Sequence, residues 1–125
     1  MTTDAMVTLT IPADAAYIRL ARLVATGFVT QMGATVADLD DVRTVVDELC
    51  SLLLAHAGPD DQIAVALGGN EGVLRASATA PARRPWDPDE LSEGIVRVLA
   101  DDYRVDHVDG RIELLVDKVV EVAAG

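Results

Sequence analysis

The stretch VDELCSLLLAHAG, residues 46–58, decides the fold of this chain. It reads as the second half of an amphipathic helix that we predict to run from about Val36 to Ala57, because its apolar residues recur at three- and four-residue intervals. Gly58-Pro59 ends this helix, since glycine suits the position after a helix and proline cannot continue one. The predicted buried face consists of Leu39, Val42, Val46, Leu49 and Leu53.

Segments on both sides of this helix alternate between apolar and polar residues, the pattern of strands with one buried face. Glycine-rich turns join them, first at Gly68 to Gly72 and later at Asp109-Gly110. The predicted strands are Met6–Ile11, Ile63–Leu67, Leu74–Ala80, Tyr103–His107 and Ile112–Val120, and the other predicted helices are Ala15–Met32 and Asp89–Ala100. We therefore predict a single α+β domain, residues 1–125, built as a two-layer sandwich with a mostly antiparallel mixed sheet and helices on one face.

Acidic side chains dominate the charge of the sequence. There are 21 Asp and Glu against 10 Lys and Arg, a formal net charge of -11, which repels phosphate backbones and anionic membranes. We therefore expect no direct nucleic-acid or membrane binding. The lone Cys50 fits a buried thiol in a reducing compartment. Neither a signal peptide nor an apolar run of about 18 residues is recognisable, so we expect a cytoplasmic protein.

Glu48, His56 and Ala57 have the spacing of a known motif. The helix resembles the N-box helix of the GHKL ATPase superfamily, in the small version found in anti-sigma factors of the serine-protein-kinase type, which runs Glu-x-x-x-Asn-x-x-x-His-Ala. The resemblance implies that Glu48 is the catalytic base and that an asparagine one turn later holds magnesium. Here that position is Leu52, which has no oxygen for a cation. The order of predicted elements also matches the GHKL fold.

The family's two other ATP-binding motifs are altered as well. An Asp-x-Gly-x-Gly loop, whose aspartate bonds adenine, corresponds to residues 78–86, which contain neither aspartate nor glycine. A glycine-rich lid that cradles phosphates corresponds to residues 92–101. Its first glycine is Ser92, Gly94 keeps the second, and Glu93 places a negative charge beside a triphosphate. Together with Glu48 and Leu52, Gly94 therefore marks a vestigial nucleotide pocket.

The resemblance implies an anti-sigma factor that sequesters an alternative sigma factor, in stress-response control of transcription, and is released by an anti-anti-sigma antagonist. Because the three motifs are altered, we expect no kinase activity, no ATP or other cofactor, and no metal. Two alternatives stay open. One is an active serine-protein kinase that binds ATP·Mg, uses Glu48 as its base and phosphorylates the antagonist. The other is a regulatory domain with a non-sigma partner.

The resemblance implies a protein-binding surface on the first predicted strand and helix, about Met6 to Met32. Tyr17, Arg19 and Arg22 are candidate polar residues around apolar anchors. The resemblance also implies a homodimer formed through the first strand and helix.

Arg83 and Arg84, and separately His56, have interpretations that involve no nucleotide chemistry. Arg83 and Arg84 beside Trp86 indicate either a flexible loop or an interface hot spot. Apart from its motif role, His56 is accounted for as a helix C-terminal residue stabilised by the helix dipole.

Overall fold

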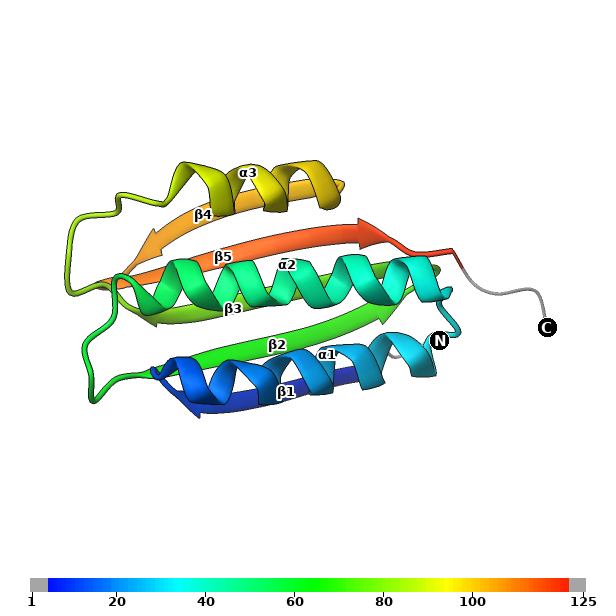
Figure 1. Ribbon diagram of the computed structural model, residues 1–125, viewed down its shortest axis with the longest axis horizontal. Coiled ribbons are helices and arrows are strands. Elements are labelled where there is room, and N and C mark those ends of the chain that lie inside the picture. The colour runs from blue at the N-terminus through cyan, green and yellow to red at the C-terminus, as the bar shows by residue number, and fades with distance from the viewer. Residues whose placement is uncertain (1–4, 122–125) are drawn as a thin grey trace.

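The computed structural model describes residues 5–121 of the chain. In order, the elements are β1 (Ala5–Pro12), the 3-10 turn η1 (Ala15–Tyr17), α1 (Ile18–Gln31), α2 (Val36–Leu54), β2 (Gln62–Asn70), β3 (Val73–Pro81), α3 (Glu90–Leu99), β4 (Asp102–Val108) and β5 (Arg111–Val119). The predicted α+β class is confirmed, with all the described helices on one face of the sheet (Figure 1). None of the described helices is long and apolar enough to cross a membrane.

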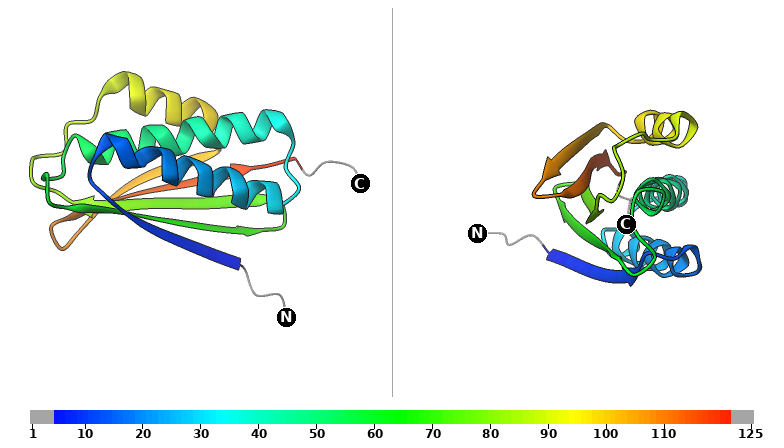
Figure 2. Two further views of the ribbon diagram at one scale, coloured as in Figure 1. Left: turned by 60° about the horizontal axis from the view of Figure 1, so that its bottom comes forward. Right: turned by 90° about the vertical axis from the view of Figure 1, so that its left-hand side faces the viewer.

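The sheet has the strand order β1-β2-β3-β5-β4. Every neighbouring pair of described strands is antiparallel. β5 therefore lies in the interior of the sheet, while β1 and β4 form its two edges. In the helical layer α2 runs along the middle, with α1 on the β1 side and α3 on the β4 side (Figure 1, Figure 2).

The core lies between the helices and the inner face of the sheet. The strand register sets Leu67 opposite Ala76, and Ala78 opposite Leu114, all pointing inward. Alanines on the inner face of β3 leave room for the larger side chains of α2. The buried residues of α2 are Val42, Val45, Val46, Leu49, Cys50, Leu52 and Leu53. Burial raises the pKa of the Cys50 thiol to about 12, so this cysteine stays protonated as a core residue.

Two helix boundaries differ from their predicted positions. Asp14 caps the 3-10 turn η1 by accepting the N–H of Ala16, and the α-helix itself begins only at Ile18. α2 ends at Leu54 rather than at Ala57. The reason is a tightened last turn, in which the N–H of His56 donates to the carbonyl oxygen three residues earlier.

The hairpin between β2 and β3 turns more tightly than the glycine-rich segment Gly68 to Gly72 predicts. Glu71 and Gly72 form the turn, with φ values of 53° and 78°. Gly69 remains in β2, where an added Cβ would lie 2.9 Å from the Sδ of Met32, just beyond α1. That glycine therefore allows the end of α1 to approach the sheet closely.

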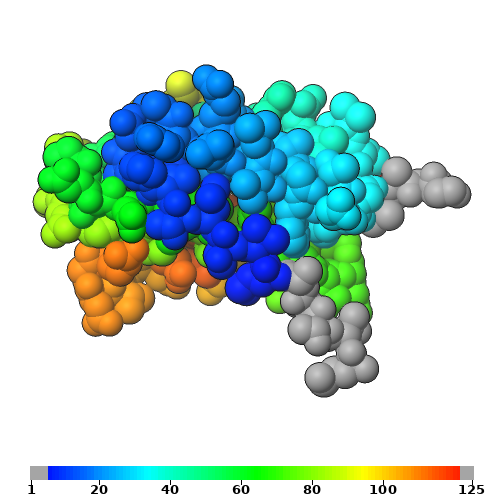
Figure 3. Space-filling view, turned by 90° about the horizontal axis from the view of Figure 1, so that it is seen from below, coloured from blue at the N-terminus to red at the C-terminus, as the bar shows by residue number. Residues whose placement is uncertain are grey.

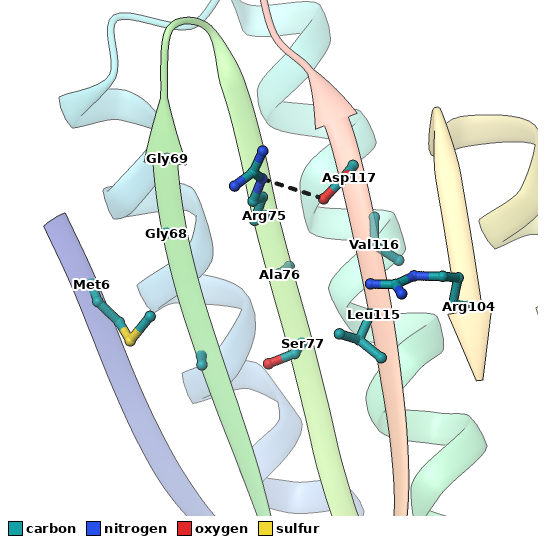
Figure 4. A pocket seen from close by; sticks show the side chains of 11 residues that line it. Met6, Gly68, Gly69, Arg75, Ala76, Ser77, Arg104, Leu115, Val116 and Asp117 are labelled. Carbon is teal, nitrogen blue, oxygen red and sulfur yellow. Dashed lines mark ion pairs between the residues drawn. The ribbon is translucent and has the colours of Figure 1, made fainter. Parts of the chain in front are cut away.

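The face of the sheet opposite the helices carries a shallow hollow of about 490 Å³ (Figure 4). Small residues at its centre, including Ala66, Gly68 and Ser77, leave the space open. Arg75 and Asp117 form an ion pair of 3.8 Å at its border. Arg104 also lines the hollow and lies 3.7 Å from the carboxylate of Asp102, so both arginines have an acidic partner.

Candidate functional site

Helix α2 carries the residues that the N-box motif singles out. Glu48 and Leu52 are one turn apart, yet their surroundings differ: Glu48 is half-buried, whereas Leu52 is 2% exposed and belongs to the hydrophobic core. A magnesium ligand at position 52 would have to present an oxygen to a bound cation. The structure instead uses this position for packing.

His56, in the turn after α2, is buried and makes two hydrogen bonds. Its Nδ1 lies 2.7 Å from the carbonyl oxygen of Leu52, and its Nε2 accepts the N–H of Asp87 at 3.1 Å. Since a carbonyl only accepts and a backbone N–H only donates, Nδ1 carries the proton and the ring is neutral. The ring also packs against Trp86, with 4.6 Å between the ring centroids. His56 is therefore a hydrogen-bonded residue at the C-terminal end of α2, as predicted, and it contacts the helix end through its bond to the carbonyl oxygen of Leu52.

The segment after β3 is fastened to the C-terminal end of α2. The backbone N–H of Arg83 donates to the carbonyl oxygen of His56 at 2.9 Å, and Nη1 of Arg84 donates to that of Ala55 at 3.0 Å. The guanidinium of Arg83 also donates twice to Asp61, at 2.9 and 2.7 Å. The bonds to Ala55 and His56 satisfy carbonyl groups that the end of a helix leaves unpaired. The expectation of a flexible loop is therefore wrong for Arg83 and Arg84.

The Asp61–Arg83 pair makes stability depend on acid pH. The Arg83 hydrogen bonds, with the N–H of Gly58, lower the pKa of Asp61 from 3.8 to about 2. A carboxyl whose pKa is lower in the folded state stabilises the fold above its unfolded pKa, and this contribution is lost as the pH falls. We expect the free energy of unfolding to decrease between pH 3.8 and about 2, and Arg83→Gln to flatten this decrease.

Chemical denaturation at a series of pH values measures this effect. Arg84→Gln is the matched control, because it removes a bond to a backbone carbonyl and leaves Asp61 paired. Equal pH slopes for wild type and Arg83→Gln would contradict the assignment.

Glu93, in the first turn of α3, is engaged within the fold. The hydroxyl of Tyr103 donates to its carboxylate at 2.8 Å, and a nitrogen of Arg97 lies 3.7 Å from it. The Arg97 guanidinium also stacks 4.9 Å from the centroid of the Tyr103 ring. Burial and the Glu93 carboxylate together hold the pKa of Tyr103 well above its usual value. Glu93 therefore links α3 to β4 and presents a carboxylate where the family has a phosphate cradle.

Lys118 of β5 joins α3 to α2. Its ammonium donates to the carbonyl oxygen of Leu99 in α3 at 2.8 Å and lies 3.5 Å from the carboxylate of Asp41 in α2. The lysine side chain is buried, and its charge lies where the C-terminal dipole of α3 favours a cation. This contact holds α3 against α2.

Gly94 lies apart from the other two predicted pocket residues. It lines a hollow of about 480 Å³ that is bordered by residues of α3 alone, and neither Glu48 nor Leu52 takes part. A Cβ added at Gly94 would meet no atom within 4 Å. The glycine thus faces open space.

The residues present do not fit ATP and magnesium. Leu52 is an apolar core residue, and the segment in the place of the adenine loop is bonded to the end of α2. Within residues 5–121, no three His, Cys, Asp or Glu side chains gather into a group that could hold a metal ion. The residues at the motif positions thus belong to a packed, hydrogen-bonded part of the fold.

Comparison with known proteins supports the resemblance that the N-box residues indicate. The sequence matches no family model. Over 66 residues it is 33% identical to the proteins named serine-protein kinase RsbW of Bacillus thuringiensis (strain Al Hakam) and Bacillus cereus (strain AH820). The match covers 51% of this chain and 41% of each relative. The chain is RsbW-like. It spans about two fifths of the length of these curated relatives, as the 41% coverage shows.

The RsbW-like fold is also seen in a solved structure. A crystal structure of the RsbU and RsbW domains of a Mycobacterium tuberculosis protein superimposes with a TM-score of 0.72 at 21% identity. The match covers 93% of this chain and 32% of that chain. Nearly all of the RsbW-like chain therefore shares this fold.

Of the predicted partner-binding residues, Tyr17 lies in η1, and Arg19 and Arg22 lie in α1, on the side of the molecule that Figure 3 shows. Tyr17 and Arg19 are exposed. Arg22 instead forms an ion pair of 3.2 Å with Asp47 of α2 and is half-buried. Leu23, one of the apolar positions of the same helix, is 60% exposed. The structure therefore places two of the three predicted residues on an accessible surface and gives Arg22 a role between α1 and α2.

Proposed function

We propose that this chain is an anti-sigma factor that acts by binding alone, without kinase activity. It sequesters an alternative sigma factor in the cytoplasm and is released by an anti-anti-sigma antagonist. The observation that supports this proposal is the burial of Leu52 in the core at the position of the family's magnesium ligand. The bonds from Arg83 and Arg84 to the end of α2 support it further, because a nucleotide would have to displace them.

Without phosphorylation, competition between partners sets the occupancy of the anti-sigma factor. Two proteins that bind overlapping surfaces exclude one another, and their affinities and concentrations decide which is bound. The antagonist in this scheme displaces the sigma factor without being modified.

The partner surface in this proposal is the exposed side of α1, with apolar anchors and a charged rim. Tyr17, Leu20 and Leu23 supply the anchors, and Arg19 supplies a cationic rim residue. Arg22 lies beside them but is already paired with Asp47.

A homodimer through β1 belongs to the same proposal. β1 is an edge strand that contains no charged residue between Ala5 and Pro12, whereas the opposite edge strand, β4, contains Asp102, Arg104 and Asp106. Charged side chains protect an edge from pairing with another chain, and β1 has no such protection. Pairing of β1 with its counterpart in a second copy would cover this edge.

An active serine-protein kinase is the second candidate function. It is favoured by the name of the Bacillus relatives, serine-protein kinase RsbW, and by the retention of Glu48, the residue that would act as base. Nucleotide binding distinguishes the two candidates.

We expect isothermal titration with ATP and magnesium to give no binding in the micromolar range. We also expect Glu48→Ala to leave repression of the sigma factor intact, because Glu48 has no metal ligand beside it. The substitution should change the free energy of unfolding by no more than about 0.5 kcal/mol. A phosphate-transfer assay on the antagonist, with wild type and Glu48→Ala side by side, completes the measurement. Transfer by the wild type that is lost in Glu48→Ala would establish the kinase instead.

The α1 surface is tested with the sigma factor captured from the native host and identified by mass spectrometry. We expect Leu23→Asp to weaken binding by about tenfold or more, since it places a charge in an apolar contact. Val36→Asp is the matched control, because Val36 is also exposed but lies at the start of α2. Hydrogen exchange across residues 6–32 should slow when the sigma factor is bound. Unchanged exchange there, with equal affinities of the two variants, would remove α1 from the proposal.

A further inference from the structure

We propose that the outer side of α3 is a docking surface for a basic amphipathic helix of a partner protein. We call this surface the α3 stripe and define it by Leu91, Gly94, Ile95 and Val98. Leu91 is 73% exposed and Val98 is 82% exposed. With Ile95 they recur at four- and three-residue intervals, so they share one side of the helix.

The shape of the α3 stripe suits an inserted side chain. An open, shallow depression lies over Gly94, where no atom comes within 4 Å of the place that a Cβ would take. Leu91 and Val98 border the hollow at either end of α3, about 10 Å apart along the helix axis. A helix with apolar residues at i, i+3 or i+4, and i+7 matches that length, which is how amphipathic helices dock onto apolar surfaces.

The α3 stripe is not used by the fold itself. The fully buried residue of α3 is Val96, and the contacts of Glu93 and Lys118 described above attach the helix to β4, β5 and α2. α3 lies at the edge of the helical layer, where no further described helix covers its outer side (Figure 1, Figure 2). Large apolar residues gathered on an uncovered surface are typical of an interaction site.

The charge around the α3 stripe selects the chemistry of the partner. Residues 86–102 contain six acidic side chains and one basic one, a net charge of -5. Glu93 and Asp102 already have basic partners in Arg97 and Arg104. The other acidic residues lie beyond the ends of the stripe, with Asp87, Asp89 and Glu90 before it and Asp101 after it. A partner helix with Lys or Arg on both sides of its apolar residues complements this pattern.

The same charge disfavours other occupants. In a second copy of this chain the same acidic segment, residues 86–102, would face its own counterpart, and the two would repel each other. An anionic lipid surface would likewise be repelled. The stripe also lies across the helical layer from α1 (Figure 1). The inference therefore goes beyond the proposed function and does not depend on the identity of the partner at α1.

A designed pair of peptides tests the inference on the full chain. The probe is a fluorescent peptide of about 15 residues that forms an amphipathic helix, with leucines at i, i+3, i+4 and i+7 and lysines on both sides. The matched peptide carries glutamate in place of every lysine. Fluorescence anisotropy measures both affinities at two salt concentrations. We expect the lysine peptide to bind at least about tenfold more tightly than the glutamate peptide, with the difference shrinking at high salt.

Three variants locate the site. Val98→Gln removes an apolar contact, and Gly94→Gln fills the hollow while leaving every apolar residue in place. Both positions face open space, so the fold should be retained. We expect each to weaken binding of the lysine peptide by about tenfold. Leu23→Gln, at a comparably exposed apolar position of α1, should leave the affinity unchanged.

Several outcomes would overturn the inference. Equal binding of the lysine peptide by wild type, Val98→Gln and Gly94→Gln would place its site elsewhere. Equal affinities of the two peptides would remove the charge argument. Self-association in sedimentation that Val98→Gln abolishes would identify a second copy as the occupant, and binding to phosphatidylglycerol vesicles that Val98→Gln abolishes would identify a membrane.

Discussion

Replacing Leu52 with asparagine is expected to lower the free energy of unfolding by about 4 kcal/mol and to leave ATP·Mg unbound. The substitution restores the residue type of the family's N-box, but Leu52 is in the core rather than beside a solvent-accessible pocket. The variant loses the packing of a buried leucine and places an amide where the neighbouring side chains are apolar. Urea denaturation and isothermal titration measure the two expectations.

Leu23→Asn is the matched control for Leu52→Asn. It makes the same chemical change on the exposed side of α1, and we expect it to change stability by no more than about 0.5 kcal/mol. If Leu52→Asn were as stable as the wild type and bound ATP·Mg, position 52 would face a usable nucleotide pocket and the binding-only proposal would fail.

Replacing His56 with alanine is expected to lower the free energy of unfolding by about 3 kcal/mol. The substitution leaves the N–H of Asp87 without its acceptor, removes the bond to the carbonyl of Leu52, and opens a space beside Trp86. Hydrogen exchange should also quicken at Asp87, because the imidazole nitrogen that protects this amide is gone. Thermal and urea unfolding, with exchange measured by NMR, provide the test.

His107→Ala is the control for His56→Ala, since the two histidines differ in burial. His107 is exposed on the edge strand β4, and its replacement should change stability by no more than about 0.5 kcal/mol. Equal effects of the two substitutions would mean that the hydrogen bonds of His56 contribute little to stability.

The strands and helices could be predicted because their signals are local. Alternating apolar residues define the strands, and residues with positive φ, such as Gly72 and Gly110, occur where the sequence shows turns. Boundaries were harder to predict. The glycines before the β2–β3 turn resemble loop residues, and only the approach of Met32 to Gly69 shows why one of them belongs to a strand.

The candidate site was less predictable because its contacts join distant parts of the chain. Arg84 reaches Ala55 across 29 residues, and Asp87 reaches His56 across 31. Nothing in the local sequence pairs these residues, so the sequence leaves Arg83 and Arg84 as either a flexible loop or an interface hot spot.

The sequence also does not show which apolar side chains are exposed. The repeat of apolar residues in α1 and α3 indicates an apolar side but does not show how much of it the sheet covers. The structure leaves Leu23 and Val98 outside, while the smaller Ala21 and Ala25 face the core. Leu52 shows the converse, because its motif position implies a ligand-binding residue and its actual neighbours make it a core residue.

The interior position of β5 bears on how the protein is made. A ribosome delivers β3 and β4 before β5, so the nascent chain holds two strands without the one that pairs with both. Until residues 111–119 emerge, the edge of β3 that pairs with β5 is open, and the core lacks Ile112, Leu114 and Val116. The sheet is therefore complete only once β5 has left the ribosome.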